Sequence, residues 1–438
     1  MMKLEGLSRG QVKWRAFLIF LICLSTLSPL GLGKTRPEGI IRLACYSRNF
    51  ATSGGGHASV EYIKDPMIIL EPVPVIGKYS LGHGVDPREI RRAARIYFPR
   101  VYEQLLENDV TIFQEAPLDT EGYTNFEPQF LRWCKDYVLE GGKSLDMYGG
   151  DASFSGGVEY GYPSWENTPV ADVLPVEMIP GGIRGIVSAG GKWATAGVST
   201  YVEFIDDVIG LARLPWDTAP RPQYDGPLNA VNFRPGARKI AVATRDDESY
   251  PLIAYWELGE GSSLAYTAVF GSGGTGRILD WKWYPDMIVY LVYQSAGVPM
   301  PENIYMPHVI RERLQLYASE KEFAYNYLDF IEKLGGSTVS LEIDIGEIEE
   351  VRKESADLYL QGRYEESRDV LNEAVDSMAG VLEEAKKLEE RVLFWIYLIE
   401  WFVVVGTLLV CGVLLNFLMV RRSLYREVAV TRSGRRNH

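Results

Sequence analysis

The first third of the chain alternates between short apolar runs and segments whose apolar residues recur at helical spacing. Apolar runs without regular polar alternation are typical of strands buried on both faces. Strands that alternate with helices over short connections predict a parallel sheet with right-handed crossovers. The expected strands are residues 40–45, 67–70, 110–114 and 144–148, and the expected helices are residues 87–108 and 127–139.

The pattern changes after residue 149. Residues 149–223 are rich in Gly, Pro and aromatic residues and show few clear periods. Strand patterns then return, with an alternation of apolar and polar positions that indicates antiparallel or mixed pairing. These strands are expected at residues 240–244, 252–256 and 263–270, and helices follow at residues 284–296 and 308–334.

Residues 341–391 are highly charged and contain no Pro, yet their apolar positions keep helical spacing. Residues 356–367 have the form of a tetratricopeptide-type turn, with Gly362 between two helices. One such hairpin falls short of the three repeats that a solenoid needs. The segment therefore predicts a helical hairpin, either a solvated stalk that leads toward a membrane or a docking surface for a partner.

The C-terminal region contains an uninterrupted apolar stretch, Phe402 to Val420. Its nineteen residues cover about 28 Å at helical rise, close to the roughly 30 Å hydrocarbon thickness of a bilayer. Arg421 and Arg422 follow directly, which predicts a cytoplasmic tail by the positive-inside rule. An aromatic interface belt is expected on the other side, from Trp395, Tyr397 and Trp401. A buried helix of a soluble core would explain neither flank.

The N-terminus fits the same topology. Basic residues precede an apolar run over residues 16–32, the layout of a secretory signal peptide or a signal anchor. Whether this segment is cleaved stays open at the sequence level. Either alternative places residues 37–392 outside the cell, on a protein that passes the cell membrane once or twice.

Composition narrows the choice of partners. The net charge of −13 argues against a nucleic-acid partner, and no basic patch of recognition length occurs outside the termini. The four Cys residues exclude a disulfide-dense scaffold. Cys23 and Cys411 lie in the two apolar segments, which leaves Cys45 and Cys134 as either one disulfide or two buried thiols. We expect the bilayer and an envelope or membrane protein as partners.

The most specific motif runs from Met147 to Gly157, and a Thr-Pro…Leu-Pro-Val element follows at residues 168–176. This stretch resembles the glutamine amidotransferase-like family, a membrane-associated branch of the class I glutamine amidotransferase superfamily. The resemblance covers roughly residues 40–298, and it is close in the first motif and loose elsewhere. It implies a flavodoxin-like α/β sandwich, the fold class that the strand and helix pattern also indicates.

The catalytic residues of that superfamily have no counterpart in this sequence. Class I amidotransferases need a Cys within Gly-x-Cys-x-Gly, where a strand-to-helix elbow exposes the thiolate. Cys45 and Cys134 lack that context, and no His is followed by an acid two residues on. Residues 37–392 contain no Gly-x-Ser-x-Gly elbow either. The sequence therefore predicts a pseudoenzyme.

Glycines at the carboxyl end of a strand allow a ligand to approach the backbone, or they allow close packing under a loop. Both alternatives stay open for the turn after residue 148. Asp146, Asp151, Glu159 and Asp172 match no metal motif, so we expect neither a metal nor another cofactor. The aromatic residues beside the turn could stack on a sugar or a peptide, or lie buried. Candidate ligand-binding residues are Gly149, Gly150, Asp151, Ser153, Phe154 and Glu159.

The sequence thus favours a membrane-anchored extracellular binding or assembly module with an unidentified ligand. Alternatives are a surface hydrolase that uses carboxylates such as Asp151 and Glu159, and a receptor subunit of a transporter. The expected domains are a leader (residues 1–36), an amidotransferase-like α/β domain (37–336), an acidic juxtamembrane helical hairpin (337–392), a transmembrane helix (393–420) and a basic tail (421–438).

Overall fold

The computed structural model divides the chain into two units, residues 1–40 and 41–438. The helices and strands described below all lie in the second unit. The predicted leader lies outside the described residues. The structure describes residues 39–47, 64–75, 88, 92, 95–118, 126–150, 152–155, 163–184, 200–206, 210–218, 223–224, 228–245, 248–269, 278 and 281–433.

One mixed sheet organises the α/β part of the chain, and five of its strands run parallel in the order β2-β1-β3-β4-β11. Leu43 is level with Val110, which in turn is level with Ser144. The expected parallel sheet is confirmed. Its strands are β1 (Ile41–Ser47), β2 (Ile68–Pro74), β3 (Val110–Gln114), β4 (Ser144–Gly149) and β11 (Gly261–Val269).

Beyond β11 the sheet becomes antiparallel, in the order β11-β10-β9-β6-β7. β5 pairs with β8, and β8 joins β11. The mixed pairing that the alternating pattern indicated is therefore confirmed. The remaining strands are β5 (Val176–Arg184), β6 (Thr200–Phe204), β7 (Gln223–Tyr224), β8 (Leu228–Phe233), β9 (Arg238–Arg245) and β10 (Glu248–Leu258).

Two hydrophobic cores cover the two faces of the sheet, because neighbouring residues of a strand point to opposite sides. Leu43 and Cys45 of β1 belong to the core beneath α6 (Tyr284–Ser295), whose residues are apolar and buried almost all round. Ala44 and Tyr46 belong to the core beneath α5 (Pro128–Leu139). Short 3-10 turns complete these layers at η3 (Trp165–Asn167), η4 (Ala171–Val173) and η5 (Leu211–Arg213).

The expectation of one continuous helix over residues 87–108 is wrong. Residues 95–97 are helical, residues 98–101 are not, and the chain becomes helical again in α4 (Tyr102–Leu106). Pro99 explains the break, because its ring removes a backbone donor and disfavours helical geometry at the residue before it.

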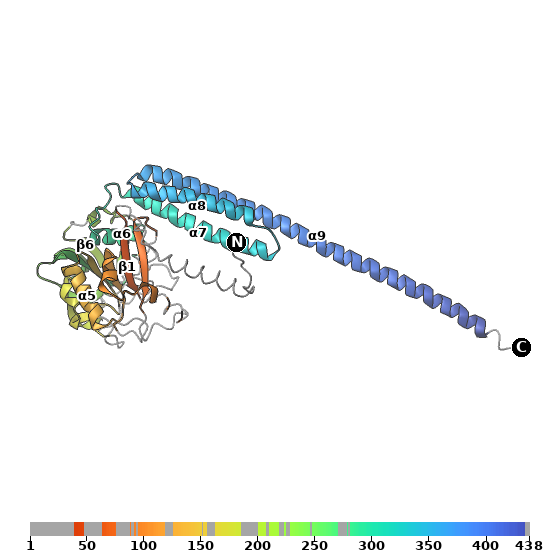
Figure 1. The fold of residues 1–438 in the computed structure, drawn as a ribbon, viewed down its shortest axis with the longest axis horizontal. Helices are drawn as coiled ribbons and strands as arrows, with labels where there is room; N and C mark the ends of the chain where they lie inside the picture. Colours follow the sequence, from red (N-terminus) through yellow and green to blue (C-terminus); the bar gives the residue numbers. More distant parts are fainter. Residues whose placement is uncertain are drawn as a thin grey trace, which may run out of the picture. The chain divides into compact units, whose positions relative to one another are not determined.

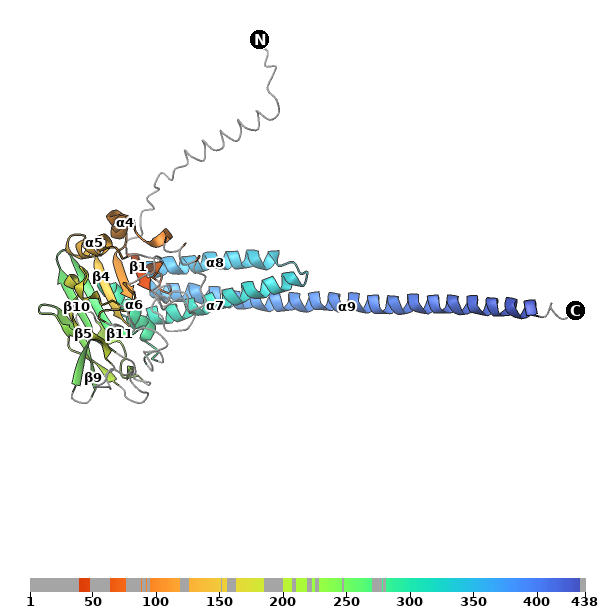
Figure 2. The same ribbon diagram turned by 90° about the horizontal axis from the view of Figure 1, so that it is seen from below.

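After the α/β part, three long helices share a core of their own (Figures 1 and 2). α9 (Tyr364–Ser433) packs against both α7 (Tyr305–Lys333) and α8 (Val339–Leu360). Gly362, at φ +73°, separates α8 from α9, at the place where the sequence indicated a turn between helices. The predicted boundary at residue 336 stays a prediction, since α7 packs with the helices that follow it.

Figure 2 shows α9 continuing well past the ends of α7 and α8. Within it, the segment Tyr364–Ser423 is long and apolar enough to cross a membrane, with a most apolar window of mean hydropathy 2.6 that is 0% buried. A long apolar C-terminal helix is thus confirmed, while its orientation in a membrane stays a prediction.

Candidate functional site

The two glycines at the end of β4 are enclosed by neighbouring chain. A Cβ added to Gly149 would lie 2.3 Å from the carbonyl oxygen of Thr267, and one added to Gly150 would lie 2.1 Å from Cγ of Glu115. Side chains at these positions are essentially excluded by such distances. The geometry therefore supports close packing as the reason for Gly at both positions, while a ligand-binding role stays a prediction.

Asn229 of β8 holds this turn from the other side. Its Oδ1 accepts a hydrogen bond from the Gly150 N–H at 2.9 Å, and its Nδ2 donates to the carbonyl oxygens of Gly150 at 3.0 Å and Ser153 at 3.3 Å. The backbone amide of Gly150 is thus hydrogen-bonded within the chain. No local pattern pointed to Asn229, because it lies 79 residues from Gly150 along the chain.

Ser153 and Phe154 are both buried in this turn. The hydroxyl of Ser153 donates to the carbonyl oxygen of Tyr148 at 2.6 Å and accepts from the backbone N–H of Glu115 at 3.1 Å. The carbonyl of Phe154 accepts from the backbone N–H of Trp165 at 2.8 Å. Since Tyr148, Phe154 and Trp165 are fully buried, the burial alternative holds for these three aromatic residues.

Backbone strain accompanies this packing. Glu115 and Phe154 adopt φ values of 46° and 54°, in a region that residues with side chains rarely occupy. Glu115 directly follows β3, and its side chain lies where a Cβ on Gly150 would otherwise be. Such strain persists only where the surroundings enforce it. The ends of β3 and β4 are therefore packed tightly against each other, through Glu115 and Gly150.

Of the four acidic residues near the turn, the structure describes Asp146 and Asp172, and these two lie apart. Asp146 lies buried beneath α6, where it accepts hydrogen bonds from Ser295 Oγ at 2.7 Å and Ser144 Oγ at 3.1 Å. Asp172 is exposed and pairs with Lys135 Nζ at 2.8 Å. Asp151 and Glu159 lie outside the described residues. In the part of the chain that the structure describes, no three His, Cys, Asp or Glu side chains gather as metal ligands.

Asp146 is nevertheless an unusual carboxyl group. Burial raises its pKa to about 7, against the opposing effect of hydrogen bonds from Ser295, Ser144 and the backbone of Leu264. Its carboxyl is enclosed between β4 and α6, on the face away from α5. The group with the raised pKa is therefore part of the protein core and does not line a cleft.

The thiols of Cys45 and Cys134 are separate and inert. Cys45 and Cys134 are both free and buried, and they belong to the cores on opposite faces of the sheet. The structure therefore holds two buried thiols and no disulfide between them. Burial raises the pKa of both thiols well above its usual range, which keeps them protonated and removes their nucleophilic character.

A buried ionic network joins the α/β part to the helical bundle. Nη1 of Arg311, on α7, lies 2.6 Å from Oδ2 of Asp65, which precedes β2. The same guanidinium binds Asp286 of α6 through Nη2 and donates to the hydroxyl of Tyr290 at 3.0 Å. All three charged side chains are almost completely buried.

Tyrosines complete the coordination of Asp65. Tyr293 of α6 donates to both of its carboxylate oxygens at 3.0 Å, and Tyr359 of α8 donates to Oδ2 at 2.9 Å. Residues from the loop before β2 and from α6, α7 and α8 thus meet around two carboxylates and one guanidinium. Each charge faces a partner of opposite sign, as burial of an ion requires, although among the described residues Nε of Arg311 has no hydrogen-bond partner.

His308 extends the network toward the surface. Its Nδ1 lies 2.7 Å from Oδ2 of Asp286, its Nε2 lies 3.4 Å from Oε1 of Glu312, and Trp283 stacks on its ring with 4.2 Å between centroids. Burial alone would raise the pKa of Asp286, but Arg311 and His308 outweigh it and hold that pKa below its usual value. Asp286 is therefore ionised at neutral pH.

Comparison with known families now decides the classification of the α/β part. Residues 93–293 match the family described as "Putative glutamine amidotransferase". This match, over a little less than half of the chain, supports the glutamine amidotransferase-like family for these residues. The resemblance noted in the sequence is confirmed for this range, which includes β3, β4, the Gly149–Gly150 turn and nearly all of α6.

Two solved structures show weak similarity to this chain. A β-galactosidase from Rahnella sp. R3 is 13% identical with a TM-score of 0.27, over 45% of this chain and 25% of that one. A catalytic mutant of a GH42 β-galactosidase from G. stearothermophilus is 10% identical with a TM-score of 0.30, over 59% and 30%. The chain thus covers less than a third of either enzyme. A comparison with curated proteins gives no match.

The amidotransferase-like range ends within α6, so the ionic network crosses its boundary. Asp286 and Tyr290 lie inside the matched range, whereas Arg311 and Tyr359 lie in the helices that follow it. Asp286 is the only charged residue of α6, and a lone charge in an apolar helix was the available signal for a buried partner. Its partner, however, could not be identified from the pattern.

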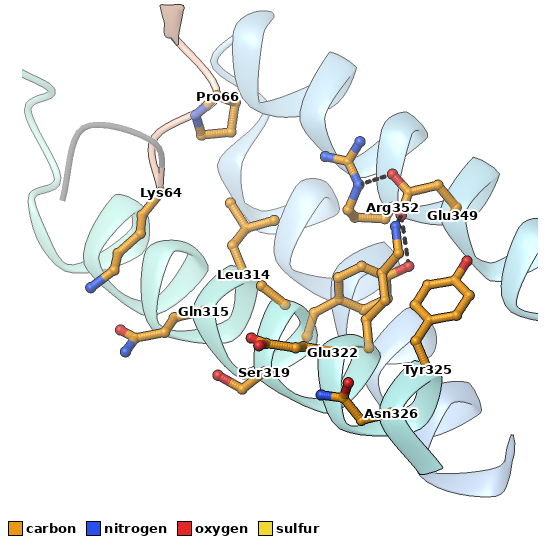
Figure 3. Close-up of a pocket in the computed structure, with 13 residues that line it drawn as sticks. Lys64, Pro66, Leu314, Gln315, Ser319, Glu322, Tyr325, Asn326, Glu349 and Arg352 are labelled. Carbon is orange, nitrogen blue, oxygen red and sulfur yellow. Dashed lines mark hydrogen bonds and ion pairs between the residues drawn. The ribbon is translucent and has the colours of Figure 1, made fainter. Parts of the chain in front are cut away.

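A cavity of about 730 Å³ separates α7 from α8, with Lys64 and Pro66 at one end (Figure 3). Glu349 of α8 lies on its wall and accepts from Tyr317 Oη at 2.9 Å, Lys321 Nζ at 2.7 Å and Arg352 Nε at 2.8 Å. Lys321 and Arg352 are therefore both paired with the same carboxylate. The cavity is large enough for a small ligand, and its lining also includes Lys64 and Glu322.

Proposed function

We propose that this chain is a membrane-anchored extracellular binding or assembly module built on a non-catalytic glutamine amidotransferase-like domain. It resides in the cell membrane with one or two passes, most of the chain outside and the C-terminus in the cytoplasm. The basic residues behind the apolar part of α9 and the aromatic residues before it support this orientation.

The observation that carries the proposal is the ionic network around Arg311. It links the amidotransferase-like domain to α7 and α8, which pack on the helix that contains the apolar segment. An enzyme tethered for local action needs only a flexible linker. A fixed connection to the anchor instead sets the orientation of the domain, which is what an assembly partner would recognise.

The state of the thiols supports a non-catalytic role. Cys45 and Cys134 are buried and their pKa values are raised, so neither offers the exposed thiolate of an amidotransferase. The turn that would serve as an oxyanion site uses the Gly150 amide to bind Asn229. Binding of a ligand at Gly149, Gly150, Asp151, Ser153, Phe154 and Glu159 is part of the proposal.

The finer fold assignment belongs to the proposal as well. The strand order β2-β1-β3-β4-β11 has the form of the flavodoxin-like order, in which the second strand lies at the edge. We assign the α/β part to that class. We further assign α8 and the first half of α9, joined at Gly362, as a juxtamembrane hairpin between the domain and the bilayer.

The test uses the full chain in detergent or in nanodiscs. Ammonia release from glutamine is measured for the wild type and for Cys45→Ala, and thiols are titrated with a chromogenic disulfide before and after denaturation. We expect no glutamine hydrolysis above the protein-free rate and no reaction of the buried thiols in the folded chain. Hydrolysis that disappears in Cys45→Ala would overturn the non-catalytic assignment.

A second measurement addresses assembly. The size of the solubilised protein is determined by native electrophoresis directly from the membranes of cells that make it. We expect a species larger than the monomer, and we expect Arg311→Met to shift it toward the monomer while the chain remains in the membrane. A wild-type protein that is monomeric at every detergent ratio would contradict an assembly role.

A further inference from the structure

Exposed apolar side chains gather at the end of the bundle where α7 turns back into α8. Phe330 on the last turns of α7 is 45% exposed, and Val339 and Ile343 on the first turns of α8 are 60% and 58% exposed. Val339 and Ile343 are four residues apart and therefore share one face of the helix. We call these three residues the bundle tip.

Contacts with α9 fix the level of the bundle tip along that helix. Tyr327 of α7 donates a hydrogen bond to Glu389 of α9. One turn further on, a Cβ on Gly336 would lie 3.0 Å from Cγ2 of Val392. The connection between α7 and α8 therefore lies beside Val392, and only α9 continues beyond it (Figure 2).

The apolar run of α9 starts at the same residue. From Val392 to Val420 the only charged residue is Glu400. These 29 residues cover about 42 Å at helical rise, which equals the roughly 40–45 Å of a bilayer with its headgroups. With Arg421 at the inner surface, Val392 reaches the outer edge of the headgroup layer.

From this coincidence we propose that the bundle tip is a second membrane-contact site, which places Phe330, Val339 and Ile343 in the headgroup layer of the outer leaflet. The proposal rests on the proposed membrane anchorage through α9. A lipid surface, rather than a protein, fits the tip because the tip is continuous with the lipid-facing helix. Exposed aromatic residues of α9 lie in the adjoining turns, namely Phe394, Trp395 and Tyr397.

The charges around the tip define the lipid chemistry. Lys333 pairs with Asp329, so it is not available to an anionic headgroup. Glu332 and Glu342 lie within hydrogen-bond distance of Thr338 Oγ1, at 2.6 and 2.9 Å, and both carry negative charge. The tip thus suits zwitterionic headgroups, and an anionic surface would repel it.

The test places a fluorescent reporter at the tip of the full chain in phosphatidylcholine vesicles. Val339→Cys is labelled with an environment-sensitive maleimide, and quenching by a nitroxide carried on the lipid headgroup region is measured. The matched control is Leu316→Cys, an exposed apolar position on α7 about 21 Å further from the membrane. The chain without an added Cys gives the labelling background.

We expect quenching at position 339 at least threefold stronger than at position 316, and weaker when phosphatidylglycerol replaces phosphatidylcholine. Equal quenching at the two positions would overturn the proposal, whether both are strong or both weak. Stronger quenching in phosphatidylglycerol would overturn the zwitterionic assignment.

Flotation of the same vesicles distinguishes a failure of membrane anchorage through α9 from a failure of membrane contact at the bundle tip. A chain that floats with the vesicles but shows no quenching at position 339 leaves the membrane anchor intact and refutes the bundle tip alone. A chain that does not float refutes the proposed anchorage and the bundle tip together. Because both reporter positions are exposed, the labelled variants need not disturb the fold.

Discussion

Arg311 and Asp65 lie 246 residues apart in the sequence, yet their side chains meet at 2.6 Å inside the protein. The contact joins the loop before β2 to α7, and Asp286 of α6 holds the other side of the same guanidinium. Burial of three charges at one point is costly unless each is paired. An arrangement that separated Arg311 from Asp65 and Asp286 would leave these charges without that partner, so the network favours the observed junction between domain and bundle.

Removal of Arg311 should be strongly destabilising. Arg311→Met leaves Asp65 and Asp286 buried without their cation, a change that typically costs about 3–5 kcal/mol. The measurement is thermal or denaturant unfolding of the full chain in detergent. As a control, Lys282→Ala removes one partner of an exposed pair 3.9 Å apart, and we expect a change below about 1 kcal/mol. Equal effects of the two variants would contradict this account of the junction.

Asn229 should matter far more than its neighbour on the same strand. Asn229→Leu keeps the approximate size of the side chain but leaves the N–H and carbonyl of Gly150 without partners, at a cost of about 1–3 kcal/mol per group. Asn232→Leu serves as the control, since Asn232 is exposed. The measurement is the free energy of unfolding of both variants. A loss of stability confined to Asn232→Leu would show that the hydrogen bonds from Asn229 to Gly150 do not stabilise the turn.

Gly150→Ala and Gly297→Ala separate contact from backbone conformation. Gly150 and Gly297 both have positive φ, but the added methyl meets Glu115 in the first case and nothing within 4 Å in the second. We expect Gly297→Ala to cost about 1–2 kcal/mol, the usual penalty of that backbone region. Gly150→Ala should cost clearly more in the same unfolding experiment. Comparable losses would show that Glu115 moves aside.

The free energy of unfolding should depend on pH through the ionisation of Asp146, because burial raises the pKa of its carboxyl. In the native state it keeps its proton up to about pH 7, whereas in the unfolded chain it ionises near 3.8. Its contribution is therefore fully present below pH 3.8 and is lost as the pH rises to 7, with a slope of up to about 1.4 kcal/mol per pH unit. Above pH 7 the dependence flattens.

Asp146→Asn removes that dependence. Unfolding of the wild type and the variant is compared at several values between pH 4 and 8, and the stability difference should shift in favour of the variant as the pH rises to 7. A difference that stays constant over this range would show that Asp146 ionises as an ordinary carboxyl group.

Most strands and helices could be predicted because their signal is local. The apolar run at residues 110–114 coincides with β3, and Pro128 and Gly141 mark the ends of α5 closely. The helix expected over residues 87–108 failed at Pro99, which was visible in the sequence. The prediction followed the helical spacing of the apolar residues in that segment, although Pro99 is a local signal for the end of a helix.

The candidate site was less predictable because its decisive contacts are not local. Gly149 and Gly150 were found from the motif, but the role of Asn229 depends on a strand pairing that no local pattern encodes. Asp286 could be noticed as a lone charge, while its partners Arg311 and His308 form part of an ordinary charged helix. These residues could not be predicted because their partners lie far away along the chain, not because their side chains lack reactive or charged groups.

α9 is one helix from Tyr364 to Ser433, which has a mechanical consequence. If α9 crosses a bilayer, its C-terminal end and the bundle form a lever without an internal joint. The part of α9 beyond Val392 is about 62 Å long, so a tilt of about 10° at the bundle would move residue 433 by about 11 Å. A load on the α/β part would thus become a measurable displacement on the opposite side of the membrane.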